Sequence, residues 1–318
     1  MKNNATRLLG WAVHNAPVIV LALIIIFTAL MTDRFFTQIN LRNILLQASI
    51  ISVLSMGMTF VIISGGFDLS VGAIVAAAGC AAAWAMLQVG VVFGIGVGLL
   101  VGLVAGVING TLVAWFRLNS FITTLGAMVT IRGFAMLFTE GQPVYGTEGL
   151  PASFLNYAQG TFLAIPLLTW TPLILFVILS WALHFSAYGK KLYAVGGNAE
   201  AAYLAGIPVA RMRASAFAIC GLSSGIAGVM MASRLQSGQP TAEHGYELTA
   251  VAAVVLGGAT LHGGEGRLIM TIVGVLIMVI LGNALNLIGV NSYWQPITVG
   301  IVILFAALAD QLKRSWRR

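Results

Sequence analysis

The sequence predicts an all-α membrane protein, and three observations lead to that prediction. Of its 318 residues, 59% are hydrophobic and 8% are charged, whereas a soluble protein carries about 25% charged residues. The apolar residues gather in roughly ten runs of about 20 residues, the length at which a helix crosses the hydrocarbon core of a bilayer. Strand-type alternation is absent, which argues against a transmembrane barrel. The chain therefore has the lipid bilayer as its main solvent.

The expected spans follow one another with short polar connections. Glycines in the fourth span, at positions 94, 96, 98, 102 and 106, predict close helix packing rather than a ligand site. The second and third spans also allow a re-entrant hairpin as an alternative. The apolar runs cover residues 15–31, 44–64, 69–87, 91–115, 121–138, 162–184, 214–233, 248–261, 268–287 and 294–312, with a looser segment at 140–161 before the sixth.

The distribution of basic residues orients these ten spans. Cytoplasmic segments of membrane proteins carry an excess of Lys and Arg. With both termini in the cytoplasm, the expected outer segments hold only Arg34, Arg42 and Arg234, and Arg132 falls inside the fifth span. The other twelve of the sixteen basic residues then lie in inner segments: Lys2, Arg7, Arg117, Lys190, Lys191, Arg211, Arg213, Arg267, Lys313, Arg314, Arg317 and Arg318.

The segment 188–213 is a polar interruption with clustered basic residues at both of its ends. Within it, Asn198 predicts the N-cap of a short helix over residues 199–204, and Gly206 followed by Pro208 predicts its end. A short helix held between two spans on the cytoplasmic side favours docking to a soluble partner. The alternative is a solvated loop that contains an incidental turn of helix.

Two further interruptions resemble each other. Asp68-Leu69-Ser70 opens the third span, and Glu247-Leu248-Thr249 opens the eighth, so each places an acid, a leucine and a hydroxyl residue before small apolar residues. Paired interruptions in corresponding spans are typical of inverted repeats around a central pathway. This pattern predicts two inverted halves of five spans. Simple helix capping is the alternative, because Asp, Ser and Thr all favour helix N-termini.

Other polar residues inside the spans are candidates for a substrate pathway. Arg132 is expected to form an ion pair with Asp68, Glu140 or Glu247, or to extend toward the membrane interface. The asparagines favour interhelical hydrogen bonds, with an open polar pathway as the alternative. The candidate pathway residues are Asp68, Ser70, Asn109, Arg132, Glu247, Thr249, Asn283 and Asn286.

Several chemistries are not indicated. The sequence has no GxxxxGK[ST] motif for ATP, and its four histidines have no metal-ligand spacing. Cys80 and Cys220 lie inside apolar runs and predict small packing residues. The net charge of +7 comes from residues beside the spans, so it does not indicate nucleic-acid binding. The chain itself is expected to be no enzyme and to bind no metal or cofactor.

Three motifs in this order resemble a known family: SGGFDLSVGAI, YAVGGNAEAAYLAGIPVARMR and GYELTAVAAVVLGGATLHGGEGR. They resemble the permease subunits of bacterial ABC importers for monosaccharides, the ribose permease type, in a broader family shared with branched-chain amino-acid permeases. The resemblance extends over residues 40–310. The sequence departs from the family pattern at AVGG, where AIGG is common, and at Phe67, where Ile is common, so it does not identify the sugar.

The resemblance implies a single permease domain over residues 1–318, in the bacterial inner membrane. It implies a second permease subunit, identical or not, a periplasmic sugar-binding protein, and two ATPase subunits or one fused tandem ATPase that use ATP and Mg²⁺. Residues 188–213 would be the loop that couples to the ATPase. The matching positions in that loop are Gly197, Asn198, Glu200, Ala201, Ala202, Gly206 and Ile207.

Two other hypotheses remain open. In the first, the chain is an ion-coupled secondary transporter in which Asp68, Glu247 and Arg132 form a relay. In the second, the ABC architecture carries another solute, such as a nucleoside, a signalling furanose or a branched-chain amino acid. An amino acid would need partners in the pathway for both a carboxylate and an ammonium group.

Overall fold

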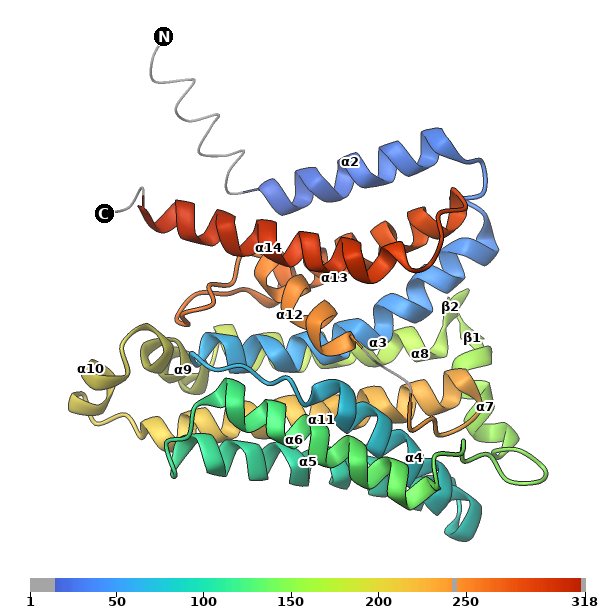
Figure 1. Cartoon of the computed structure of the whole chain (residues 1–318), viewed down its shortest axis with the longest axis horizontal. Coiled ribbons are helices and arrows are strands. Elements are labelled where there is room, and N and C mark those ends of the chain that lie inside the picture. The colour runs from blue at the N-terminus through green and yellow to red at the C-terminus, as the bar shows by residue number, and fades with distance from the viewer. Residues whose placement is uncertain (1–14, 242–244, 316–318) are drawn as a thin grey trace.

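The computed structural model describes residues 15–241 and 245–315, and it is an elongated bundle of helices (Figure 1). The expected cytoplasmic residues Lys2, Arg7, Arg317 and Arg318 lie outside the described residues. The elements are α2 (Ala16–Met31), α3 (Gln38–Ile63), α4 (Val71–Val89), α5 (Val91–Ala114), α6 (Ser120–Thr139), α7 (Ala152–Gln159), β1 (Thr161–Phe162), β2 (Ile165–Pro166), α8 (Leu167–His184), α9 (Ala187–Gly197), α10 (Ala199–Leu204), α11 (Val209–Leu235), α12 (Tyr246–Leu256), α13 (Leu268–Leu287) and α14 (Trp294–Ser315).

Seven of the described helices are long and apolar enough to cross a membrane: α3, α4, α5, α6, α8, α11 and α13. The helices α2 and α12 and the segment Trp294–Phe305 of α14 are apolar but shorter. The helices α9 and α10 lie at one end of the bundle, and α7 and the β1–β2 hairpin lie at the other (Figure 1). The predicted fold class, a helical membrane protein with several spans, is therefore confirmed.

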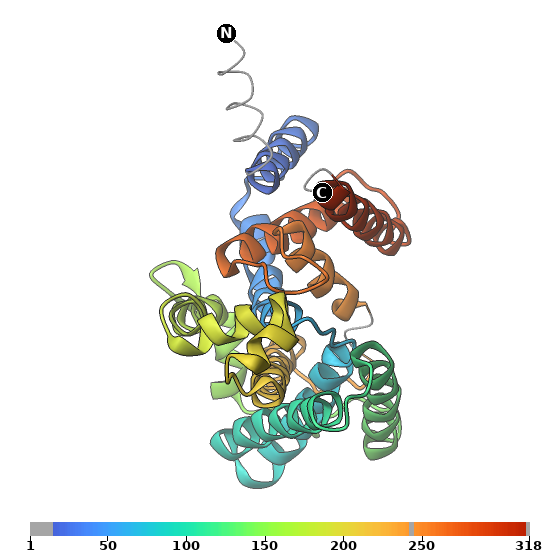
Figure 2. The same cartoon turned by 90° about the vertical axis from the view of Figure 1, so that its left-hand side faces the viewer.

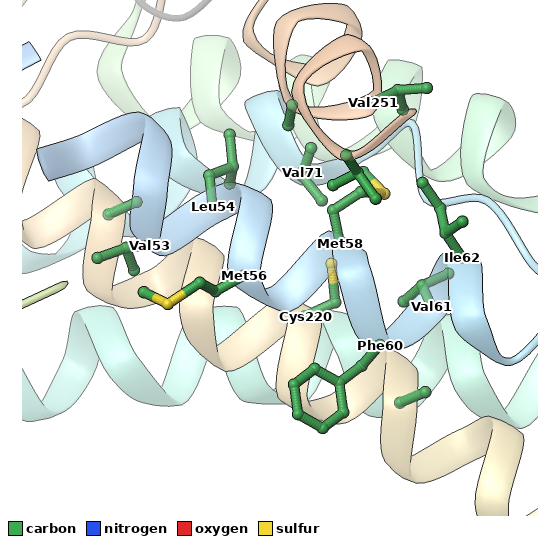
Figure 3. Close-up of a cluster of buried hydrophobic side chains, with 14 of the residues drawn as sticks. Val53, Leu54, Met56, Met58, Phe60, Val61, Ile62, Val71, Cys220 and Val251 are labelled. Atoms are coloured by element: carbon green, nitrogen blue, oxygen red, sulfur yellow. The ribbon is translucent and has the colours of Figure 1, made fainter. Parts of the chain in front are cut away.

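The helix α3 is the centre of the bundle. It contacts α8, α11, α12 and α13, and nearly all of its apolar length is buried. Figure 3 shows Met58 of α3 close to Val71 of α4 and Val251 of α12, and Phe60 and Cys220 pointing into the same core. By contrast, α5, α6 and α8 expose most of their apolar side chains, as helices that face lipid do.

Glycines bring α5 and α11 into backbone contact. A Cβ atom added to Gly102 would lie 2.6 Å from the Cα of Gly225, and one added to Gly221 would lie 2.6 Å from the Cα of Gly106. Only residues without a side chain allow this approach, so the predicted close packing of the fourth span is confirmed here. Gly96 is the exception, because a Cβ there would meet nothing within 4 Å.

The two interrupted spans enter the bundle from opposite ends. After α3 ends near α9, the linker 64–70 runs back into the bundle before α4 begins, and α12 also begins inside the bundle and runs toward the α9–α10 end (Figure 1). The helices α4 and α12 contact each other. The second and third spans are thus two long helices, α3 and α4, joined by a buried linker.

Four of the expected spans differ from the structure by five or more residues at one end: the second begins at Gln38 instead of residue 44, the eighth ends at Leu256 instead of residue 261, and the sixth and seventh begin elsewhere. The sixth span begins at Leu167 instead of residue 162, because residues 161–166 form an antiparallel hairpin whose turn places Leu163 and Ala164 at positive φ, 52° and 62°. The seventh begins directly after Pro208, so Arg211 and Arg213 lie in its first turns. The first half of the basic loop is itself a helix, α9, which the sequence analysis did not anticipate.

Candidate functional site

The predicted short helix in the loop 188–213 is α10, and its capping is as expected. The Asn198 side-chain oxygen accepts a hydrogen bond from the backbone N–H of Ala201 at 2.9 Å. At the other end, Gly206 has φ 77°, and the backbone N–H of Ile207 donates to the carbonyl of Ala202 at 3.0 Å. These contacts confirm both the cap and the stop that the sequence predicts.

The outward surface of α10 is apolar at its C-terminal end. Tyr203 and Leu204 are 71% and 80% exposed, and Glu200 is exposed in the first turn. The helix lies beyond α9 at the end of the bundle (Figure 1), where it contacts α9 and α11. Two large apolar side chains on a short helix at this place form a surface suited to docking on another protein.

A junction of glycines joins this loop to the core of the bundle. The backbone N–H of Gly264 donates to the carbonyl of Ile63 at 2.9 Å, and Gly196 lies so close that an added Cβ would overlap that carbonyl and sit 2.6 Å from the Gly264 nitrogen. A Cβ on Gly263 would lie 2.8 Å from the Cα of Gly65. The end of α9, the end of α3 and the segment after α12 therefore meet backbone to backbone.

Tyr193 adds a side-chain contact to the same junction. Its hydroxyl donates to the carbonyl of Gly266 at 2.6 Å. Burial raises the pKa of Tyr193 to about 12, and the nearby positive charge of Arg267 opposes part of that rise. The phenol therefore stays neutral and keeps its proton for this hydrogen bond at physiological pH.

The linker 64–70 holds three of the predicted pathway residues together. Asp68 Oδ1 accepts hydrogen bonds from the backbone N–H of Ser70 at 2.9 Å and from its hydroxyl at 2.5 Å. The Asn109 side-chain amide of α5 donates to the same hydroxyl at 2.8 Å. Asp68 and Ser70 are fully buried and Asn109 is 1% exposed. The other carboxylate oxygen, Oδ2, is buried without a hydrogen-bond partner among the described residues.

Two hydroxyl residues of α6 fix the same linker. Ser120 Oγ accepts a hydrogen bond from the backbone N–H of Phe67 at 3.2 Å, and Thr124 Oγ1 accepts one from that of Leu69 at 3.0 Å. These bonds satisfy backbone groups that the break between α3 and α4 leaves outside any helix. Sequence reasoning missed Ser120 and Thr124, and the only signal was their place just before and in the first turn of an expected span.

The second motif has the geometry of a local cap. Glu247 Oε1 accepts a hydrogen bond from the backbone N–H of Gly245 at 3.4 Å, and the Thr249 hydroxyl donates to the carbonyl of Gly245 at 3.0 Å. Glu247 is 8% exposed, and its Oε2 has no hydrogen-bond partner in the part of the chain that the structure describes. Both motifs therefore begin a helix inside the bundle and leave one buried carboxylate oxygen unpaired.

The ion pair expected for Arg132 does not form. Within residues 15–241 and 245–315, Arg132 contacts none of Asp68, Glu140 and Glu247, and its Nε and Nη2 are buried without a hydrogen-bond partner. Glu140 is the left-handed C-cap of the same helix, about 12 Å further along its axis. Asp68 is occupied by Ser70. The prediction of an ion pair is therefore wrong.

The remaining two asparagines form interhelical hydrogen bonds. Asn283 of α13 and Asn40 of α3 exchange two side-chain bonds, of 2.7 and 3.1 Å. Asn286 accepts a bond from the Gln295 side chain of α14 at 2.8 Å. The favoured interpretation of these residues as links between helices is confirmed.

A cavity of about 860 Å³ opens beside α10. Its walls come from three segments that are distant in sequence: the start of the linker 64–70, the loop 115–120 between α5 and α6, and the residues from Tyr203 into the first turns of α11. Arg117, Arg211 and Arg213 line it. No group of three or more His, Cys, Asp and Glu side chains that could hold a metal occurs among the described residues.

These features define a class of protein: a permease with several membrane spans, buried breaks in two of its apolar segments, and a short, capped and exposed helix at the end of the bundle. The comparisons agree with that class. A family model described as "branched-chain amino acid transport system / permease component" matches residues 40–307, and the chain belongs to that family. It is therefore a multi-pass inner-membrane transport protein and not an enzyme.

Named relatives are similar over nearly the whole chain. The chain is 44% identical to the ribose import permease protein of Bacillus subtilis, over 93% of this chain and 92% of that protein. It is 40% identical to the ribose import permease protein of Escherichia coli K12, over 96% of each, and 38% identical to an L-arabinose ABC transporter permease protein of Azospirillum brasilense, over 97% and 91%. No solved structure matches the chain.

Proposed function

We propose that this chain is the permease subunit of an ATP-driven importer that moves a monosaccharide into the bacterial cytoplasm. The observation that carries the proposal is α10, a capped, exposed helix joined by a glycine junction to the buried linker that contains Asp68. The ribose and arabinose permeases among the relatives support a sugar as the cargo. Amide and hydroxyl groups at the linker, such as Asn109 and Ser70, suit sugar hydroxyls.

The proposed topology has ten spans, in two inverted halves of five, with both termini in the cytoplasm. Seven long and three shorter apolar helices support that number. The entry of α4 and α12 into the bundle from opposite ends supports the inverted repeat. Figure 2 faces the end with α9 and α10, which we assign to the cytoplasm because the basic residues Lys190, Lys191 and Arg211 gather there.

The proposed assembly contains a second permease subunit, one or two ATPase proteins and a periplasmic sugar-binding protein. ATP and Mg²⁺ would be bound by the ATPase, and this chain would bind no cofactor. The segment 188–213 would form the coupling loop within a single permease domain. The predicted coupling residues Gly197, Glu200 and Ala201 lie in or next to α10.

The proposed mechanism uses the glycine junction. Because Gly196 is in backbone contact with Ile63 and Gly264, a displacement of α9 and α10 by the ATPase would move the linker 64–70 and the segment after α12 together. The bonds from Ser70 and Asn109 would then rearrange and expose the free oxygen of Asp68 to the pathway. Glu247 and Thr249 would play the corresponding part in the second half.

Reconstitution in proteoliposomes tests this proposal. The purified permease is combined with its ATPase and binding protein, and uptake of labelled ribose and ATP hydrolysis are measured in parallel. Gly206→Ala places a side chain at φ 77°, so it distorts the end of α10 and should abolish uptake while the permease stays in the membrane. Ribose uptake that needs an ion gradient and no ATPase would instead identify a secondary transporter.

A further inference from the structure

We propose that the arginine-lined cavity beside α10 receives an acidic element of the partner ATPase, as a second contact besides α10 itself. The inference rests on the proposed function, because it takes an ATPase as the partner. The cavity is defined by its volume of about 860 Å³ and by Arg117, Arg211 and Arg213 in its walls. Its lining contains no Asp or Glu.

The charge in this cavity is uncompensated. None of the three arginines forms an ion pair within the described residues, and the Nε of Arg213 is buried without a hydrogen-bond partner. Three guanidinium groups around one hollow create a positive potential that attracts anions. A guanidinium also presents a planar set of donors that matches a carboxylate with two parallel hydrogen bonds. The ligand chemistry that fits is therefore a carboxylate group, or several.

The position of the cavity indicates which molecule brings the carboxylates. Tyr203, Gly206 and Ile207 line it, and these residues belong to α10 or follow it directly. A protein seated on the exposed Tyr203 and Leu204 would therefore cover the mouth of the cavity. Its walls come from the start of the linker, the loop 115–120, the turn after α10 and the first turns of α11, and these segments lie at the same end of the bundle as α9 and α10 (Figure 1). That placement favours a soluble protein over a lipid headgroup.

The same contact would reach the transport pathway directly. Ser64, Gly65 and Gly66 form one wall of the cavity, and they begin the linker that carries Asp68. An acidic element bound there would touch the linker without acting through α9. The ATPase would thus hold both ends of the glycine junction, one through α10 and one through this wall.

Binding measurements between the purified permease and its ATPase test the inference. The permease is placed in nanodiscs of zwitterionic lipid, and affinity is measured at low and at high salt. Because hydrogen bonds to charged groups contribute about 1.5–3 kcal/mol, the double variant Arg211→Gln/Arg213→Gln should bind at least about tenfold more weakly. It should also lose most of the salt dependence of binding.

Two further variants separate charge from packing. Arg213→Lys keeps the charge but not the planar donor set, so it should keep the salt dependence of the wild type and lose less affinity than the double variant. Arg234→Gln makes the same change at the opposite end of α11, away from the cavity, and should bind like the wild type. All variants are compared for monodispersity and thermal unfolding. The single variant Arg211→Gln changes an exposed side chain, so it leaves the packing intact.

The outcomes distinguish the inference from the proposed function. A wild-type permease that binds no ATPase would overturn the proposed function and this inference with it. A wild type that binds, with a double variant of equal affinity and equal salt dependence, would overturn the inference alone. An effect of the arginines that appears only with anionic lipid would assign the cavity to a lipid headgroup and would also overturn it.

Discussion

The substitution Gly196→Ala tests whether the glycine junction joins the coupling helix to the transport pathway. The added methyl group would overlap the carbonyl oxygen of Ile63 and lie 2.6 Å from the nitrogen of Gly264, where ordinary contact begins at 3.4 Å. Both neighbours are backbone atoms, which cannot turn away as a flexible side chain can. The end of α9 must therefore move away from α3 and from the segment after α12.

The energetic cost of that movement follows from two terms. Overpacking of this kind costs about 1–3 kcal/mol, and loss of the hydrogen bond between Gly264 and Ile63 adds about 0.5–1.5 kcal/mol. The gain from replacing glycine by alanine in a helix offsets about 1 kcal/mol. The net cost of about 0.5–3.5 kcal/mol destabilises the junction. Near the middle of that range, it lowers the ratio of joined to separated junctions by more than tenfold.

Parallel assays of ATP hydrolysis and sugar uptake in proteoliposomes detect this shift. The Gly196→Ala permease should still assemble with the ATPase, because α10 is unchanged, but its uptake per ATP hydrolysed should fall severalfold or more. Gly96→Ala is the matched control, since its methyl group would meet nothing within 4 Å. Unchanged coupling in a Gly196→Ala permease that unfolds at the wild-type temperature would refute the junction as a link.

Three other predictions concern stability and are tested by unfolding the purified protein in detergent. Gly102→Ala should destabilise it by about 1–3 kcal/mol relative to Gly96→Ala, because Gly102 faces the backbone of α11 and Gly96 does not. Equal unfolding midpoints for the two variants would contradict the glycine packing. Asn283→Ala leaves Asn40 without one partner and should cost about 0.6–2 kcal/mol, whereas no change would mean that water replaces the bond. Burial raises the pKa of Tyr193 to about 12, so its contribution to stability should be full below about pH 10, the ordinary tyrosine value, and should be lost progressively as the pH rises from about 10 to 12; a Tyr193→Phe variant with the same alkaline loss would contradict this.

Much of the fold could be predicted from local patterns. The hydropathy of the runs indicated the helix of each long span, and the expected spans 69–87, 91–115 and 268–287 lie within two residues of α4, α5 and α13. The short helix over residues 199–204 was predicted to the residue, because its cap and stop are encoded by Asn198 and Gly206 themselves. Such signals act over a few residues and need no tertiary contact.

The candidate site was predicted only in part. The motifs around Asp68 and Glu247 were found, and Ser70 and Asn109 proved to be hydrogen-bonded neighbours. The ion pair of Arg132 was wrong, because a charge in a span does not show whether a carboxylate packs within reach of it, and in the described residues none does. The hydroxyl of Thr124, which fixes the linker, looked like any other polar residue of an apolar run.

The sequence by itself determined that this protein is a membrane protein, which of its segments are helices, and where one short helix lies between two spans. Those properties depend on the composition and spacing of neighbouring residues. Only the tertiary structure showed that Ile63, Gly196 and Gly264 meet, and that Arg117 and Arg213 face one cavity. Contacts between segments far apart in the chain depend on how the helices pack, and packing is decided by the shapes of all the surfaces together.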